Sequence, residues 1–131
     1  MAAPPEENHT GMQRLVNAFH YSVNGFRACF KTEEAFRQET YLSVLFIPLG
    51  LWIGQGIVEK CLLVGVVFIV LIVELLNTAV ERAIDRISYD RHDLSKESKD
   101  MGSAAVLSSL LLAGLVWVLI GLPRIYEYVL G

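Results

Sequence analysis

Three long apolar stretches dominate the hydrophobic pattern of the chain. Charged side chains are absent from them, with the single exception of Glu74. A helix that crosses a bilayer needs about 20 consecutive, predominantly apolar residues, and each stretch is close to that length. The stretches cover residues 40–58, 61–80 and 101–123. The pattern therefore predicts three transmembrane helices. With their flanking turns, these helices are expected to span about 34–58, 61–86 and 99–123.

A different pattern precedes the first span, within residues 12–31. Here the apolar side chains recur at helical spacing, at Leu15, Phe19, Val23, Phe26 and Phe30. They fall within an arc of roughly 80° on a helical wheel, and basic and amide side chains occupy the other side. This pattern predicts an amphipathic helix that lies on the membrane surface with its basic residues toward the headgroups. Thr32 is expected to cap the next helix, with Glu33 in its first turn.

The composition is that of a small membrane protein with one domain. Of the 131 residues, 53% are hydrophobic, and the mean hydropathy is +0.45. This length suits a single domain, which we assign to residues 11–131. Residues 1–10 are polar, contain proline and lack the pattern of a secretory signal, so we interpret them as a short disordered tail. The net charge of −3 gives no indication of nucleic-acid binding, and no nucleic-acid partner is expected.

Basic residues are distributed unequally between the loops. The turn between the first two spans carries only Lys60, whereas the loop between the last two is rich in charge. Its basic residues, with those beside it, are Arg82, Arg86, Arg91, Lys96 and Lys99. Because Lys and Arg concentrate in cytoplasmic loops, the N-terminus and the long loop are expected in the cytoplasm. The C-terminus is then expected outside.

Polar side chains form a stripe along the second span and its extension. Relative to Glu74, the side chains of Asn77, Glu81 and Asp85 fall at about −60°, −20° and +20° on a helical wheel. Glu74 lies roughly 9 Å inside the end of the apolar run. An acid at that depth is costly, so it is expected to have a partner or a function. The stripe leads from hydrocarbon into water.

The third span begins beside this stripe. Lys99 and Asp100 precede small residues at 102–105, which let two membrane helices approach closely. Acids for a divalent cation, a lysine for phosphates and an acid that accepts a proton are components of a phosphoryl-transfer site. The sequence has neither a GxxxxGK[ST] phosphate loop nor the glycine loop of soluble kinases. A polar seam between helices and a proton or ion pathway are the other interpretations.

Three motifs resemble those of the bacterial integral-membrane diacylglycerol kinase family, also called the prokaryotic diacylglycerol kinase family. They are EAFRQE at 34–39, VELLNTAVERAIDR at 73–86, which contains ExxNxxxE, and KDMGSAAV at 99–106. The resemblance implies an all-α membrane protein, a homotrimer with three transmembrane helices per subunit and an N-terminal amphipathic surface helix. It also implies a membrane kinase domain over residues 11–131, in the bacterial inner membrane, that uses Mg²⁺ and ATP to convert diacylglycerol to phosphatidic acid.

The same resemblance implies roles for individual residues. Glu74 matches the general base, Glu33 and Glu81 match the magnesium ligands, and Asn77 orients the base or the phosphate. The residues that match nucleotide-binding or metal-binding positions of the family are Arg14, Tyr21, Glu33, Glu81, Asp90, Arg91, His92, Lys99 and Asp100. The residues that match substrate-binding positions of the family are Arg14, Arg37, Glu39, Glu74, Asn77, Ser103 and Trp117. The alternatives are an undecaprenol kinase of the same fold and a non-catalytic membrane subunit that conducts protons or ions.

Overall fold

The structure is a computed structural model that describes residues 10–131, so the predicted tail lies outside the described residues except for Thr10. All the elements in this part of the chain are helical, which confirms the all-α class. In chain order they are α1 (Gly11–Thr32), α2 (Glu34–Ile53), α3 (Gly56–Ile87), α4 (Asp93–Val116), the π-helical turn η1 (Trp117–Gly121) and α5 (Leu122–Leu130).

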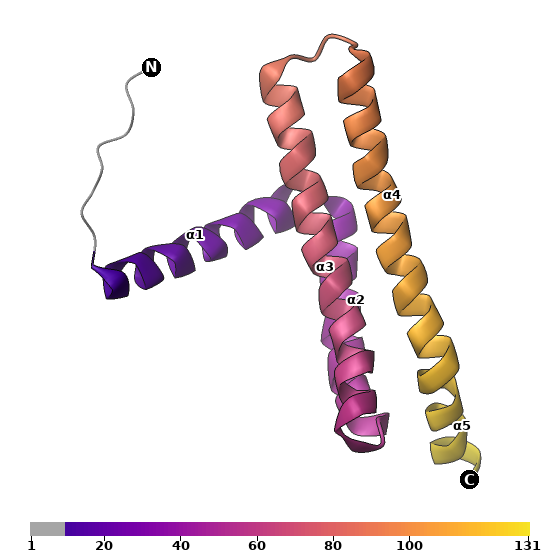
Figure 1. Ribbon diagram of the computed structural model, residues 1–131. Helices are drawn as coiled ribbons and strands as arrows, with labels where there is room; N and C mark the ends of the chain where they lie inside the picture. Colours follow the sequence, from indigo (N-terminus) through magenta and orange to yellow (C-terminus); the bar gives the residue numbers. More distant parts are fainter. Residues whose placement is uncertain (1–9) are drawn as a thin grey trace.

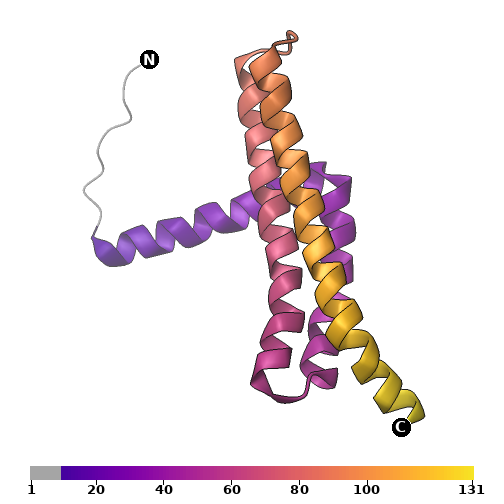
Figure 2. The same ribbon diagram turned by 45° about the vertical axis from the view of Figure 1, so that its right-hand side comes forward.

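Helices α2, α3 and α4 run side by side in a bundle, and α1 projects sideways from it (Figure 1). A second view shows the same arrangement, with α1 attached to the bundle through its C-terminal end (Figure 2). Helices α4 and α5 form one long rod joined by η1. The C-terminus and the α2–α3 turn lie at one end of the bundle, and the α3–α4 loop forms the other end (Figure 1).

Two helical segments are long and apolar enough to cross a membrane by length and composition. They are α3 and the continuous helix from Asp93 to Leu130, which joins α4, η1 and α5. Helix α2 does not reach this level, because its 20 residues begin with a charged segment that includes Arg37 and Glu39. The third transmembrane helix therefore stays a prediction.

The rod is longer than the span predicted over 99–123, because the helix continues past Pro123. Proline lacks a backbone N–H, and its ring collides with the carbonyl four residues earlier in a regular α-helix. The wider π-helical turn η1 comes directly before this position, and the backbone N–H of Leu122 donates to the carbonyl of Trp117. The change in helical geometry lets the chain continue as α5 without a break.

The elbow between α1 and α2 differs from the sequence prediction. Thr32 does not cap α2: it is the last residue of α1, and its hydroxyl donates to the Ala28 carbonyl at 2.8 Å. Glu33 alone separates the two helices, with an extended backbone at φ −110° and ψ 112°. A one-residue elbow leaves Thr32 inside the final turn of α1, where its hydroxyl bonds backward along the helix.

The core lies where α3 packs between α2 and α4. Leu63 is fully buried on α3, and Gly50 of α2 lies beside it: a Cβ added at Gly50 would be 3.1 Å from the Leu63 Cβ. By contrast, large apolar side chains such as Ile72 and Leu111 are exposed on the outer faces of α3 and α4. Outward-facing apolar side chains suit contact with lipid or with other membrane helices.

Candidate active site

Glu74 is buried in the middle of the bundle, with 6% of its surface exposed. It lies on the same face of α3 as Val66, Val70 and Thr78, all of which are buried and repeat every four residues. This face packs against the neighbouring helices, which explains why an acidic side chain at this position is shielded. A carboxyl group removed from water is costly unless other groups compensate, so the position is unusual for a merely structural residue.

Two other predicted acids lie close to Glu74. The charges of Glu81, on the same helix, and of Glu33, at the α1–α2 elbow, both act on the Glu74 carboxyl. The fold thus brings the proposed base and the two predicted magnesium ligands into one region. The charge of Glu74 also acts on the carboxyl group of Glu39 on α2.

The donor set can be tested against the needs of Mg²⁺. No group of three or more His, Cys, Asp or Glu residues with metal-binding geometry exists within residues 10–131. Mg²⁺, however, is usually bound through only one or two carboxylates, with water and substrate phosphates filling the other positions. Glu33 and Glu81 offer one carboxylate each, from the elbow and from α3, and this donor set fits the chemistry of a magnesium ion that arrives with a nucleotide.

The end of α1 is fixed beside these acids by contacts from α2 and α3. Arg37, predicted at the substrate, uses its Nη1 to donate to the carbonyls of Phe30 at 2.9 Å and Lys31 at 3.0 Å. The thiol of Cys29 donates to the Thr78 hydroxyl at 3.7 Å. Burial raises the pKa of the Cys29 thiol, and the negative charges of the nearby acids add to this effect. These contacts hold the elbow against the buried stripe of α3.

A second polar region lies at the α3–α4 loop. A cavity of about 280 Å³ is lined there by all five of the nucleotide residues predicted in the loop and the start of α4. These residues are Asp90, Arg91, His92, Lys99 and Asp100. Within the cavity, Lys99 forms an ion pair with Asp85 at 2.8 Å, and Lys96 forms one with Asp100 at 2.7 Å. Because the charge of the half-buried Glu81 also acts on Lys99, this region is electrostatically connected to one of the acids around Glu74.

The loop and the start of α4 also contain contacts that the sequence did not predict. The ring nitrogen Nδ1 of His92 accepts a hydrogen bond from the Leu94 backbone at 3.1 Å and thereby caps α4. The bond from Lys96 to Asp100 raises the pKa of the Lys96 ammonium group. The spacing of four residues between Lys96 and Asp100 on one helix was the available signal. By contrast, the ion pair between Asp85 and Lys99 agrees with the expectation that the next helix begins beside the polar stripe.

Asn77 lies at a close approach of α3 and α4. Its side-chain oxygen Oδ1 is buried and has no hydrogen-bond partner among the described residues. The side chain lies against Gly102, and the adjacent Ser103 is exposed on α4. An amide oxygen without a partner near a buried acid is available to accept a hydrogen bond from a bound molecule.

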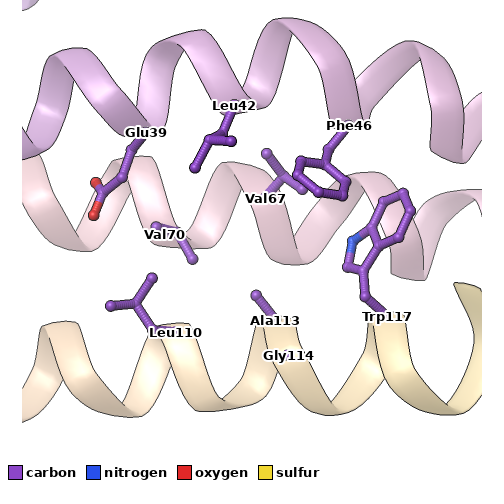
Figure 3. Close-up of a pocket in the computed structure, with 9 residues that line it drawn as sticks. All are labelled: Glu39, Leu42, Phe46, Val67, Val70, Leu110, Ala113, Gly114 and Trp117. Carbon is purple, nitrogen blue, oxygen red and sulfur yellow. The ribbon is translucent and has the colours of Figure 1, made fainter. Parts of the chain in front are cut away.

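Glu39 and Trp117, both predicted at the substrate, border one apolar cavity of about 210 Å³. The cavity lies between α2 and the α4–η1 segment, with α3 forming its back wall, and the two residues mark its opposite ends (Figure 3). Trp117 Nε1 donates to the Leu63 carbonyl at 3.1 Å, and its ring packs edge-on against Phe46 with centroids 4.8 Å apart. The remaining wall residues are Leu42, Val67, Val70, Leu110, Ala113 and Gly114.

Two predicted nucleotide residues are not brought to the acids. Arg14 and Tyr21 are both exposed on α1, whose N-terminal part extends away from the bundle (Figure 2). A single chain thus assembles the acids and the loop cavity but leaves this part of the predicted site separate.

The fold and the acids around Glu74 together define a helical membrane protein with a carboxylate-rich site in the middle of its bundle. Residues 20–121 match the family model of prokaryotic diacylglycerol kinase. The chain is 44% identical over 108 residues to a diacylglycerol kinase of Haemophilus influenzae, covering 82% of this chain and 92% of that protein. It is 43% identical over 120 residues to a diacylglycerol kinase of Pseudomonas aeruginosa, covering 92% and 98%. The diacylglycerol kinase of Escherichia coli K12 is 41% identical over 113 residues, covering 86% of this chain and 93% of that protein.

The chain belongs to the prokaryotic diacylglycerol kinase family, and it is an enzyme of that kinase class.

Proposed function

We propose that this protein uses ATP to phosphorylate the primary hydroxyl of diacylglycerol, which gives phosphatidic acid. The observation that carries the proposal is the burial of Glu74 in an apolar helix with Glu33 and Glu81 close enough for their charges to act on it. Phosphoryl transfer depends on positioning and on charge neutralisation more than on covalent chemistry by the protein. In this proposal, the lipid alcohol and the nucleotide meet at these acids.

In this proposal Glu74 is the general base. A base must reach the proton that it removes, so the proposal requires the glycerol group of the lipid to reach Glu74 on α3. The hydroxyl oxygen forms a bond to the γ-phosphorus, and its proton passes to Glu74. The bond between the γ-phosphorus and the bridging oxygen breaks, and ADP leaves with that electron pair. Asn77 accepts a hydrogen bond that orients the reactants, because its Oδ1 lacks another partner among the described residues.

The nucleotide lies on the loop side of the acids. Glu33 and Glu81 would hold Mg²⁺, which supplies positive charge against the phosphates when it is bound. Lys99 adds a further positive charge, for which it exchanges its ion pair with Asp85. The loop cavity receives the rest of the nucleotide through Asp90, Arg91, His92 and Asp100.

The lipid lies on the membrane side of the acids. Arg37 acts on the substrate through the elbow that it fixes, and Ser103 contacts the substrate from α4. Glu39 and Trp117 border the apolar cavity between the helices, which suits an acyl chain. The three transmembrane helices are α2, α3 and the α4–α5 rod.

We further propose a homotrimer in the bacterial inner membrane. The separation of Arg14 and Tyr21 from the acids supports a site that is completed by a neighbouring subunit. The N-terminus and the α3–α4 loop are cytoplasmic, and the C-terminus is periplasmic. This orientation agrees with the basic residues of the loop and with the position of the C-terminus at the opposite end of the bundle (Figure 1).

The decisive experiment is a phosphate-transfer assay in mixed micelles, with ATP radiolabelled at its γ-phosphate. Diacylglycerol and undecaprenol are compared as acceptors for the unaltered chain, Glu74→Gln and the exposed control Glu97→Gln. We expect labelled phosphatidic acid, a loss of about a hundredfold or more in Glu74→Gln, and normal activity in Glu97→Gln. Preferential labelling of undecaprenol would contradict diacylglycerol as the substrate and identify the protein as an undecaprenol kinase. Proton flux through liposomes without ATP consumption would favour a non-catalytic subunit.

A further inference from the structure

Arg82 connects α3 to the elbow that carries Glu33. Its Nη2 lies 3.3 Å from Glu33 Oε1 and also donates to the Thr32 hydroxyl. The side chain of Arg82 is 51% exposed and that of Glu33 is 31% exposed. The sequence predicted no partner for Arg82, because nearly fifty positions separate the two residues along the chain. The contact arises only because α1 returns to α3 at this point.

Among the described residues, hydrogen bonds at two positions of α3, Thr78 and Arg82, attach the end of α1 and the elbow to α3. Thr78 and Arg82 are four residues apart and therefore share a face of α3. Thr78 bonds to Cys29, and Arg82 bonds to Thr32 and Glu33 in the next turn of the chain. The Glu33 carboxylate is thus held by Arg82 of α3, the residue that directly follows Glu81 in the sequence.

The charges explain what such a contact achieves. The charges of Glu33 and Glu81 both act on Glu74, and like charges that share a site repel one another. A guanidinium group on Glu33 offsets part of that repulsion while no metal is bound. The same positive charge opposes the arrival of a second cation at Glu33. Arg82 therefore affects both the position of this carboxylate and its affinity for a metal ion.

We propose that Arg82 is a positioning residue that acts through Glu33, fixing this carboxylate at the elbow and serving as its counterion until a divalent cation binds. The inference rests on the proposed function, in which Glu33 holds Mg²⁺. It predicts that the positive charge at residue 82 lowers the affinity of the nucleotide-free protein for a divalent cation. The effect belongs to the Arg82–Glu33 pair and not to the net charge of α3.

The test is a titration of the full-length, nucleotide-free protein with Mn²⁺ alone, followed by the electron paramagnetic resonance signal of free Mn²⁺. In Arg82→Gln the Mn²⁺ dissociation constant is expected to fall about two- to fivefold, the range that an exposed ion pair supports. Arg82→Met is a second neutral variant with the same expectation. Arg82→Lys retains the charge and should bind Mn²⁺ like the unaltered chain.

Two controls separate this role from a general effect of charge or folding. Arg86→Gln removes the same charge one turn further along α3 and should change Mn²⁺ affinity much less. On a Glu33→Gln background, Arg82→Gln should have no further effect, because the carboxylate through which it acts is absent. The difference in Mn²⁺ affinity between Arg82→Gln and the unaltered chain should also become smaller as ionic strength rises.

Several results would overturn the inference. These are no Mn²⁺ binding by the unaltered chain, unchanged affinity in both neutral variants, or an equal change in Arg86→Gln. Lipid phosphorylation is measured in the same preparations. Normal phosphorylation by the unaltered chain with any of these results refutes only the counterion role. Absence of lipid phosphorylation in the unaltered chain refutes the proposed function itself.

Discussion

Gly102 of α4 lies directly against the side-chain amide of Asn77 on α3, so that a Cβ added at Gly102 would overlap Asn77 Oδ1. The oxygen is buried and lacks a hydrogen-bond partner among the described residues. The two helices reach this separation because residue 102 has no side chain. The position of the Asn77 side chain, one turn from Glu74 on α3, thus depends on a glycine of another helix.

We expect Gly102→Ala to destabilise the bundle and to reduce lipid phosphorylation. The added methyl group must displace Asn77 or separate α3 from α4, and such overpacking typically costs about 1–3 kcal/mol. Reversible unfolding in mixed micelles measures the first effect, and the phosphate-transfer assay measures the second. Gly65→Ala is the matched control: an added Cβ there meets no described atom within 4 Å. Equal behaviour of the two variants would contradict this account of Gly102.

Trp117 contributes a hydrogen bond as well as an aromatic surface. Trp117→Phe keeps a ring against Phe46 but removes the Nε1 donor to the Leu63 carbonyl. The expected loss in the free energy of unfolding is about 0.5–1.5 kcal/mol, since the Leu63 carbonyl also has its own helical partner. Trp117→Ala should cost clearly more, because it also leaves part of the cavity wall empty. If both variants lost the same stability, the ring would contribute nothing beyond its N–H.

The end of the bundle opposite the α3–α4 loop is fastened by Arg124. Its guanidinium group donates to Glu59, with the shortest contact at 2.7 Å, and to Glu127 at 2.9 Å. Arg124→Gln should lower the unfolding midpoint by a few degrees and leave the Mg²⁺ requirement of lipid phosphorylation unchanged, because the acids of the site lie elsewhere. Glu59→Gln should have a similar effect, and the double variant should lose less than the sum of the two. An altered Mg²⁺ requirement would show that this end communicates with the site.

Helix positions were largely predictable from the sequence, because long apolar runs and amphipathic spacing reflect local burial. The runs that contain Glu74 and Gly102 lie in α3 and α4 as expected, and Leu15 and Phe19 lie on the separate helix α1. The elbow was not predictable in detail. Thr32 has the chemistry of a cap, but its role depends on where α1 ends, and that depends on packing against α3.

The site was predictable as a set of acids but not as a set of contacts. Helical periodicity places Glu74, Asn77 and Asp85 on one stripe, but it does not say which neighbour covers each turn. In the structure, Glu74 is buried by the bundle, Asn77 faces Gly102, and Asp85 pairs with Lys99. The contacts between α1 and α3 join residues that are 49 or 50 positions apart. No local pattern encodes such a pairing, so only the folded chain reveals it.

The Cys29 thiol reports on the charge of the neighbouring acids. Burial raises its pKa above the ordinary value of 9.0, the bond to Thr78 opposes this, Glu33 and Glu74 raise it further, and Arg82 lowers it. Because the folded-state pKa is raised, folding favours the protonated thiol. Its contribution to stability is complete below pH 9.0 and is lost as the pH rises through the raised value.

We therefore expect the titration of the Cys29 thiol in a Cys61→Ala background to show a pH midpoint above 9.0 in the folded protein and near 9.0 after unfolding. Glu33→Gln should lower the folded midpoint, because it removes a negative charge near the thiolate. Arg82→Gln should raise it, because it removes a positive one, whereas Arg86→Gln should leave it nearly unchanged. The carbon-13 chemical shift of the Cys29 β-carbon, measured against pH by nuclear magnetic resonance, provides these midpoints. If Glu33→Gln raised the midpoint, Glu33 would not be acting on Cys29 as a negative charge.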